Sequence, residues 1–205
     1  MSLTLLIIVI TALISYQGFS NRSFLEKTIF YPYGIRQRRE WYRFMSSGFI
    51  HAGWMHLIIN MYVLYMFGEL VENWYIISYG SSGHLTYLIM YLAAIFVSGI
   101  LSYFRHNDDM SYRSLGASGA VSAVVFSAIL IFPDMPLSLL FVPFRLPAWI
   151  FGLLYMAYSI IMSKSGRGNI NHDAHLLGAV FGFAVTALLD PQLFFTFLDK
   201  IQSAI

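Results

Sequence analysis

The sequence has no cysteine and unusually little charge. Only 11% of its 205 residues are charged, whereas soluble domains have about 25%, so a soluble fold is nearly excluded. Without cysteine there is no disulfide, no thiolate metal ligand and no thiol nucleophile, and covalent catalysis would need another side chain. The net charge of +2 comes from dispersed residues. Because the chain lacks a basic block, we expect no nucleic-acid partner.

Hydrophobic residues, in contrast, make up 58% of the chain. One bilayer crossing takes about 20 apolar residues, so this composition supplies about six crossings with little left for an extramembrane domain. We therefore expect an all-α membrane protein, with a single membrane domain over residues 1–205 embedded in the lipid bilayer. The six expected transmembrane helices cover about residues 3–18, 53–72, 84–104, 117–132, 148–163 and 174–190.

The connections between these spans differ in length and character. The first, from Tyr16 to about Ala52, is by far the longest and is rich in aromatic and basic residues. Four prolines between residues 133 and 147 make the connection after the fourth span a poor helix. The last span ends at Asp190–Pro191. The first apolar run has no basic residue ahead of it, so we interpret it as a span and not as a cleaved signal peptide.

Few strongly polar side chains fall within the spans. An ionisable group inside a bilayer costs several kcal/mol, so each one marks a candidate functional site. They lie in the first turns of the second, fourth and sixth expected spans, which start on the same side of the membrane in an up-and-down bundle. Topology therefore predicts that they form one layer. They are His56 and Asn60, the segment Gly116–Gly119, and the segment His172–His175.

These residue types are those of acyl-transfer chemistry. A serine becomes a nucleophile when a base takes its proton, and histidine is the usual base, so Ser118 and His175 form the natural pair. His56, Asn60 and the backbone N–H of Ser118 can donate hydrogen bonds to a developing oxyanion. Gly116 and Ala117, which precede the serine, belong to the same candidate oxyanion and substrate-binding group.

Each feature also has a simpler interpretation. A Gly-Ala-Ser-Gly segment can be a packing notch, and His56 with Asn60 can join helices by hydrogen bonds. His172 is a competing base, three residues before His175, and we interpret His51, His84 and His106 as interfacial or loop residues. The chain has no His-Glu-x-x-His motif for a zinc protease. It also has no duplicated halves of a transporter. We expect no metal and no cofactor.

In combination, these motifs resemble those of the rhomboid intramembrane serine proteases. The matching segments are His56-x-x-x-Asn60, Gly116-Ala117-Ser118-Gly119 and Ala174-His175-x-x-Gly178-x-x-x-Gly182. The resemblance implies a six-transmembrane-helix rhomboid-like bundle with a long embedded first loop. It also implies a Ser118–His175 dyad without a third acid. His56, Asn60 and the Ser118 amide would form the oxyanion hole.

Two positions depart from the pattern that the resemblance implies. The family usually has tryptophan directly before an arginine of the first loop, whereas this chain has Tyr42-Arg43 with Trp41 one place earlier. Family members often carry a tyrosine four residues after the nucleophile, where it stacks on the catalytic histidine, and this chain has Ser122 there. His175 would then be held by another aromatic side chain or less firmly. A silent rhomboid-like protein that binds transmembrane helices is the alternative to an active protease.

The resemblance further implies the substrate and the location. The substrates would be single-span membrane proteins cut beside a small residue, and the membrane would be the inner membrane of a prokaryotic cell. Span five and the Gly166–Gly168 connection would move to admit substrate. The basic residues favour a cytoplasmic site by the positive-inside rule, whereas the family usually has its N-terminus inside and its site opening outward. We favour the family orientation, because that rule applies poorly to a loop embedded in the interface.

Overall fold

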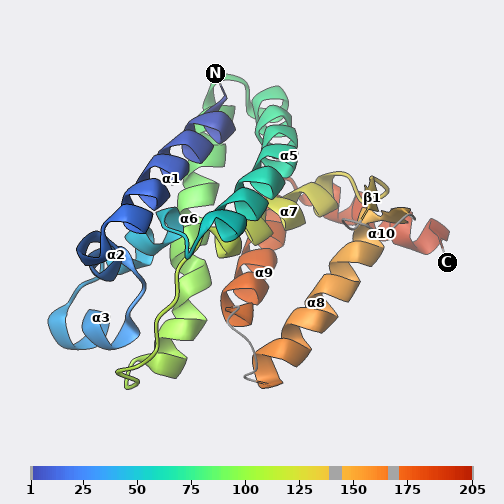
Figure 1. Cartoon of the computed structure of the whole chain (residues 1–205). Helices are drawn as coiled ribbons and strands as arrows, with labels where there is room; N and C mark the ends of the chain where they lie inside the picture. The colour runs from blue at the N-terminus through green and yellow to red at the C-terminus, as the bar shows by residue number, and fades with distance from the viewer. Residues whose placement is uncertain (1, 139–144, 166–170, 205) are drawn as a thin grey trace.

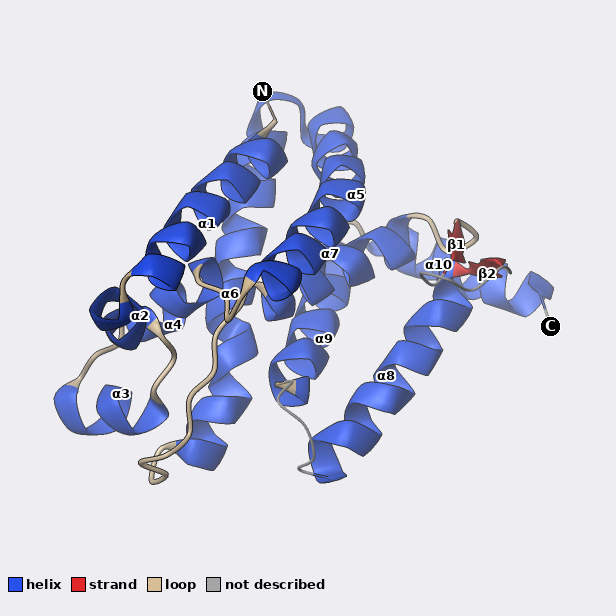
Figure 2. Cartoon of the chain, in the orientation of Figure 1, coloured by secondary structure: helices blue, strands red, loops and turns tan. Residues whose placement is uncertain are grey.

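The structure, a computed structural model, describes residues 2–138, 145–165 and 171–204. It is a bundle of helices with one short β-hairpin (Figures 1 and 2). The long helices are α1 (Leu3–Ser20), α5 (Trp54–Tyr79), α6 (Gly83–His106), α7 (Ser118–Ile131), α8 (Ala148–Ser165), α9 (His172–Leu189) and α10 (Pro191–Ala204). The shorter elements are α2 (Arg22–Thr28), α3 (Pro32–Arg38), α4 (Arg43–Ser46), η1 (Ser47–Phe49), η2 (Gly80–Ser82), β1 (Pro136–Ser138) and β2 (Arg145–Pro147).

The helices correspond to the apolar runs of the sequence. Three helical stretches are long and apolar enough to cross a membrane: α1, the continuous stretch Trp54–His106 that contains α5 and α6, and α9. Ser118–Ile131 and Ala148–Lys164 are shorter apolar helices. The expected all-α membrane bundle is therefore confirmed, while the number of six crossings stays a prediction.

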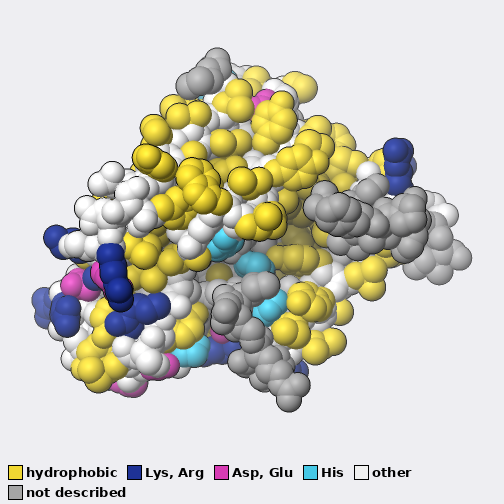
Figure 3. All heavy atoms as spheres, viewed as in Figure 1, with side chains coloured by type: hydrophobic (Ala, Val, Ile, Leu, Met, Phe, Trp, Pro, Cys, Tyr) yellow, Lys and Arg dark blue, Asp and Glu magenta, His cyan; other side chains and the backbone are white. Residues whose placement is uncertain are grey.

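Helix α7 forms the centre of the bundle. Every residue from Gly119 to Leu130 is buried, so this helix is surrounded by protein and not by lipid. It packs most closely on α9 and also contacts α5 and α6. Large apolar side chains are exposed on the outer helices instead, including Leu13 on α1, Ile58 on α5 and Ile161 on α8. Figure 3 shows this apolar covering, with the Lys and Arg side chains gathered mainly over the first connection.

The first connection folds into short helices. Residues 22–49 form α2, α3, α4 and η1. Arg43, at the start of α4, is buried and donates hydrogen bonds to the Glu40 carboxylate (2.6 Å) and to the carbonyl oxygens of Glu26 (2.9 Å) and Ile29 (2.8 Å). These bonds satisfy the guanidinium and hold the connection in a defined shape. Helices of three to seven residues are too short to show a helical periodicity, so they were not predicted.

A buried carboxylate joins α1 to α5. Glu72 is 1% exposed and accepts hydrogen bonds from the backbone N–H groups of Leu3 and Thr4 and from the Thr4 hydroxyl, each at 2.8 Å. The ring of His84 on α6 lies 3.0 Å away. The first turn of a helix has N–H groups without internal partners and a positive dipole end, so a carboxylate is well placed there.

The segment after residue 190 was not predicted. We expected the last span to end at Asp190–Pro191, and α9 does end at Leu189, but a further helix, α10, begins at Pro191. Proline is favoured at the first position of a helix, and the Asp190 side chain caps this one by accepting a hydrogen bond from the Gln192 N–H at 3.0 Å. The proline-rich connection after α7 is non-helical, as expected, and pairs Pro136–Ser138 with Arg145–Pro147.

Candidate active site

Ser118 is the first residue of α7 and is half-buried. The preceding Gly116 has a φ of 121°, a conformation that favours glycine. Its N–H donates a hydrogen bond to the carbonyl oxygen of Ser47 at 2.9 Å. A Cβ atom at Gly116 would lie 2.7 Å from Cε1 of His56 and 3.0 Å from Nε2. The glycine therefore allows the imidazole of α5 to lie directly against the turn that presents the serine.

Glycines also bring α7 and α9 together. A Cβ atom built on Gly178 would lie 2.0 Å from the carbonyl oxygen of Gly119, and one built on Gly182 would lie 2.0 Å from that of Ala123. Near the serine, a Cβ atom on Gly119 would lie 3.2 Å from the carbonyl oxygen of Ala174. The residues next to Ser118 and His175 thus contact each other through their backbones. This is the small-residue packing that membrane helices use for close approach.

Ser118 and His175 lie on facing ends of α7 and α9, but no hydrogen bond joins their side chains in the part of the chain that the structure describes. Catalytic hydrogen bonds are often long or poorly aligned without substrate. Figure 3 shows histidine side chains exposed in a hollow in the middle of the drawn face, surrounded by apolar side chains. The helix packing is therefore compatible with the predicted pair, and the reacting hydrogen bond would require a rearrangement of the side chains.

The ring of His175 has an aromatic neighbour on α8. Tyr155 stacks on it with ring centroids 6.3 Å apart and an interplanar angle of 18°. The Tyr155 hydroxyl lies 2.9 Å from the Ser122 hydroxyl. Ser122 occupies the position where the resemblance led us to look for a stacking tyrosine. The aromatic side chain beside the histidine thus comes from a different helix, an arrangement that sequence spacing alone could not predict.

His56 and Asn60 occupy the first turns of α5. The ring of His56 is half-buried and Asn60 is buried. The Asn60 side-chain amide donates a hydrogen bond to the carbonyl oxygen of His56 at 2.9 Å, which uses one of its two N–H groups. The second N–H group is the one that could donate to an oxyanion. The contact of His56 with Gly116 places this imidazole beside the serine turn.

His51 lies in the loop before α5, in agreement with the sequence interpretation as an interfacial or loop residue. Its burial was not predicted, since the side chain is 1% exposed. The Ser15 hydroxyl donates to the carbonyl oxygen of Phe49 (3.1 Å), so His51 Nδ1 donates to Ser15 Oγ (3.0 Å) and Nε2 accepts from the Ala117 N–H (3.4 Å). These roles require the neutral imidazole with its proton on Nδ1. In agreement, burial and the neighbouring His56 lower the pKa of His51 to about 3.

His51 therefore joins α1 to the backbone of the serine turn. Its ring also meets the ring of His56 edge to face, with centroids 4.9 Å apart. The sequence feature that could have identified this role of His51 is its position five residues before His56, in a segment with few other polar groups. Of the other two histidines assigned to loops or the interface, the side chain of His84 is half exposed, and His106 ends α6 and stacks on Tyr112 at 3.8 Å.

His172, the competing base, is buried in the first turn of α9. Its ring meets Tyr158 of α8 edge to face at 5.5 Å and lies 6.0 Å from the ring of His175. The next residue, Asp173, accepts hydrogen bonds from Arg105 of α6 (2.5 Å) and from Ser163 of α8. Asp173 thus ties three helices together at this end of the bundle.

A small polar cavity lies beside the serine. It has a volume of about 40 Å³, and a buried water needs about 10–15 Å³ measured in this way, so the cavity can hold a few waters. Ser47, Ser98, Ser114 and Asn171 line it together with Ser118. Within the described ranges, no group of three His, Asp or Glu side chains could hold a metal ion.

Fold and site together define a helical integral membrane protein with serine and histidine on adjoining helices. The profile of the family described as "Rhomboid domain" matches residues 38–192. The chain belongs to the rhomboid family, which includes intramembrane serine proteases and acts on transmembrane substrates within the bilayer.

Individual relatives agree with this assignment. The chain is 30% identical to "Rhomboid-like protein 11, chloroplastic" of Arabidopsis thaliana over 73% of its own length and 52% of the relative's. It is 32% identical to "RHOMBOID-like protein 12, mitochondrial" of the same plant, over 66% and 42%. It is 31% identical to the human "Presenilin-associated rhomboid-like protein, mitochondrial", over 67% and 35%. The chain thus spans about half or less of the length of these curated relatives.

Proposed function

We propose that this protein is an intramembrane serine endopeptidase that cleaves transmembrane segments of membrane proteins. The observation that carries the proposal is the backbone contact between α7 and α9, where Gly178 meets Gly119 and Gly119 meets Ala174. This contact brings the first turn of α7, with Ser118, against the first turn of α9, with His175, which supports these two residues as the reacting pair.

In the proposed mechanism, His175 takes the proton of the Ser118 hydroxyl as Oγ attacks a peptide carbonyl carbon. The C–N bond of the tetrahedral intermediate then breaks, and His175 gives the proton to the leaving amine. The remaining acyl-enzyme reacts with a water molecule, whose proton passes to His175, and the ester bond to Ser118 breaks with return of that proton to Oγ. The cavity lined by Ser47, Ser98 and Ser114 is a source for this water.

The oxyanion would be stabilised by three donors. The N–H of Ser118 is at the start of a helix, where backbone N–H groups have no internal partners and the dipole favours negative charge. The His56 ring and the free N–H of Asn60 come from α5. Gly116 permits the approach of His56, and the N–H of Ala117 is hydrogen-bonded to His51. The Gly116–Ala117 turn would thus keep these donors and the serine at one level of the bundle.

A fluorophosphonate probe tests the proposal, because it reacts only with an activated serine. In folded protein reconstituted in lipid, we expect labelling of the wild type and loss of labelling in Ser118→Ala and in His175→Ala. Ser122→Ala is the matched control, since it removes a serine hydroxyl from the same helix, and it should still be labelled. An unlabelled wild type would contradict the proposal and favour a silent helix-binding protein. Labelling that survives in His175→Ala and is lost in His172→Ala would assign the base to His172.

We further propose single-span membrane proteins as substrates and the inner membrane of a prokaryotic cell as the location. The polar site opens between apolar helices, so a substrate that reaches it laterally would itself be apolar. The relatives quoted above carry mitochondrial or chloroplastic names, and that description is theirs.

Cleavage of a single-span reporter in vesicles, absent with Ser118→Ala, supports the substrate class. Fractionation of the source cells for the endogenous protein tests the location. The proposed movable connection, residues 166–168, lies outside the described residues.

A further inference from the structure

The helix that holds the aromatic partner of His175 is also the most loosely packed of the bundle around the site. Helix α8 contacts α9 and, less extensively, α7. Much of its length is exposed, including Leu153, Leu154 and Ile161. Figure 1 shows α8 at one side of the bundle, beside α9 and apart from α1. A displacement of α8 would therefore cost fewer contacts than a displacement of the central helices.

We infer that Tyr155 is the positioning residue for His175, so that the docking of α8 on α7 aligns the base. The inference rests on the proposed function and deepens it. Two contacts of Tyr155 act together: its ring stacks on the imidazole at 6.3 Å and 18°, and its hydroxyl bonds the Ser122 hydroxyl at 2.9 Å. Ser122 is one turn after the nucleophile on α7. Tyr155 thus bridges the helix of the nucleophile and the ring of the base.

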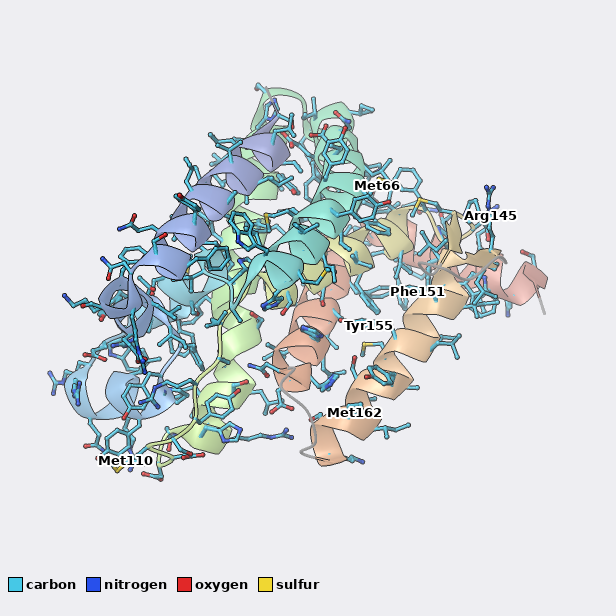
Figure 4. All side chains as sticks on the ribbon, in the orientation of Figure 1. Met66, Met110, Arg145, Phe151, Tyr155 and Met162 are labelled. Atoms are coloured by element: carbon cyan, nitrogen blue, oxygen red, sulfur yellow. The ribbon has the colours of Figure 1, made fainter. Side chains whose placement is uncertain are left out.

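The surroundings of Tyr155 fix its ring plane. Phe126 of α7 lies 5.7 Å away at 50°, and Phe151, one turn earlier on α8, lies 6.1 Å away at 26°. Figure 4 labels Phe151 and Tyr155 on the side of α8 that faces α9. The hydroxyl bond opposes a rotation of α8 that would carry the ring off the imidazole. Within residues 2–138, 145–165 and 171–204, the His175 ring makes no hydrogen bond to an acid, so ring stacking is its main orienting contact there.

The geometry has a functional consequence. A tyrosine on α7 would stay beside His175 whatever α8 does, because α7 and α9 are in backbone contact. A tyrosine on α8 leaves when α8 moves away from α7. The base is then aligned only when α8 is docked on α7.

The test compares rates of fluorophosphonate labelling at Ser118. We expect Tyr155→Leu to label at least tenfold more slowly than the wild type and Tyr155→Phe, which keeps the ring, to recover most of that loss. Leu154→Ala is the matched control, because it shortens an exposed apolar side chain next to Tyr155 on α8, and its rate should stay within about twofold. Equal slowing in Tyr155→Leu and Leu154→Ala, or a Tyr155→Leu rate equal to the wild type, would overturn the inference.

Two further measurements keep the inference testable where Tyr155→Leu folds poorly. Tyr155→Phe and Ser122→Ala remove the same hydrogen bond, so the double variant should be no slower than the slower single variant, and additive losses would contradict the bridge. The imidazole ¹H–¹³C signals of the Ser118→Ala protein give a readout without activity. Tyr155→Leu should shift the His175 signal, identified by its loss in His175→Asn, and Leu154→Ala should not. A shifted signal with an unlabelled wild type would reject the protease and keep the stacking role.

Discussion

At the scale of single residues, the site depends as much on missing side chains as on present ones. Gly116, Gly119 and Gly178 each lie where a methyl group would meet an imidazole, a serine hydroxyl or a carbonyl oxygen. Because these three glycines have no side chain, the first turns of α5, α7 and α9 can approach one another. The glycines themselves take no part in the reaction. Substitutions at these positions therefore test the geometry of the site without removing a reacting atom.

Gly178→Ala should destabilise the fold by about 1–3 kcal/mol, the usual cost of overpacking. The new Cβ would lie 2.0 Å from the Gly119 carbonyl oxygen, so α9 must move away from α7, and fluorophosphonate labelling of Ser118 should fall. Thermal unfolding in detergent and labelling rates measure both effects. Gly53→Ala is the control, because a Cβ atom there meets nothing within 4 Å. Equal stability of the two variants would show that the α7–α9 contact is not as close as described.

A second prediction at this scale concerns His51. His51→Ala removes a hydrogen-bond partner from both the Ala117 N–H and the Ser15 hydroxyl. This loss should lower the free energy of unfolding by about 1–3 kcal/mol. The lowered pKa also gives a pH dependence. Between the unfolded value near 6.5 and about 3, the unfolded state binds a proton that folded His51 does not, so stability falls as the pH decreases through this window. The fall in melting temperature from pH 7.5 to pH 5 should be smaller in His51→Ala than in the wild type. An identical fall in both proteins would remove His51 as a source of acid sensitivity.

At the scale of elements, α8 is held at two points. Tyr155 fixes its middle, and Ser163, near its end, is bonded to Asp173 of α9 and lies 3.0 Å from Arg105 of α6. The cluster of Arg105, Ser163 and Asp173 joins α6, α8 and α9 at this end of the bundle. It is therefore a candidate restraint on the position of α8 that is separate from the reacting groups.

Asp173→Asn should loosen this restraint. Arg105 is about half exposed, so solvent screening limits the loss to about 0.5–1 kcal/mol. We expect a small decrease in melting temperature together with faster proteolytic cleavage near the end of α8. Arg36→Gln is the control, since it breaks the exposed pair Arg36–Asp108 at a distance from α8 and should leave the cleavage rate unchanged. Cleavage that responds equally to both substitutions would argue against a specific restraint.

The sequence predicted the long elements because their apolar runs are longer than most soluble helices and end at polar or proline-containing segments. It also predicted that Ser118 and His175 would approach, since alternate spans begin on one side. It could not predict contacts that depend on rotation between helices. Tyr155 reaches His175 from α8, and His51 reaches Ala117 from before α5, at sequence separations that no periodicity encodes. The short α2–α4 and the capped α10 were missed because no long apolar run marks them; Asn21 caps α2 and Pro32 begins α3.

At the scale of the whole molecule, the charge distribution and the family pattern give opposite orientations. Lys and Arg side chains gather mainly over the first connection, at the end of the bundle that carries the site (Figure 3). Arg145, in contrast, lies in β2, and Lys200 pairs with Asp134 beyond the end of α7. The positive-inside rule applies poorly to a loop embedded in the interface, so we give the family orientation more weight.

We therefore expect the N- and C-termini on the cytoplasmic side and the site on the opposite side. A C-terminal reporter that is active only in the cytoplasm should be active, and a reporter that requires the exported compartment should be inactive. A reporter inserted near Asp109, in the exposed connection before the serine turn, should give the reverse result. The opposite pair of results would show that the basic residues control the orientation.

The shortness of α7 sets the depth at which a substrate would be cut. Its 14 residues rise about 21 Å, against a hydrocarbon core of about 30 Å. If the end of α7 at Ile131 reaches one boundary of the core, Ser118 lies about 9 Å below the other. A single-span helix cut at that level keeps only about 14 residues in the larger fragment, too few to cross a bilayer. The cut would thus weaken the anchorage of both products, and release from the membrane would follow from where the serine helix begins.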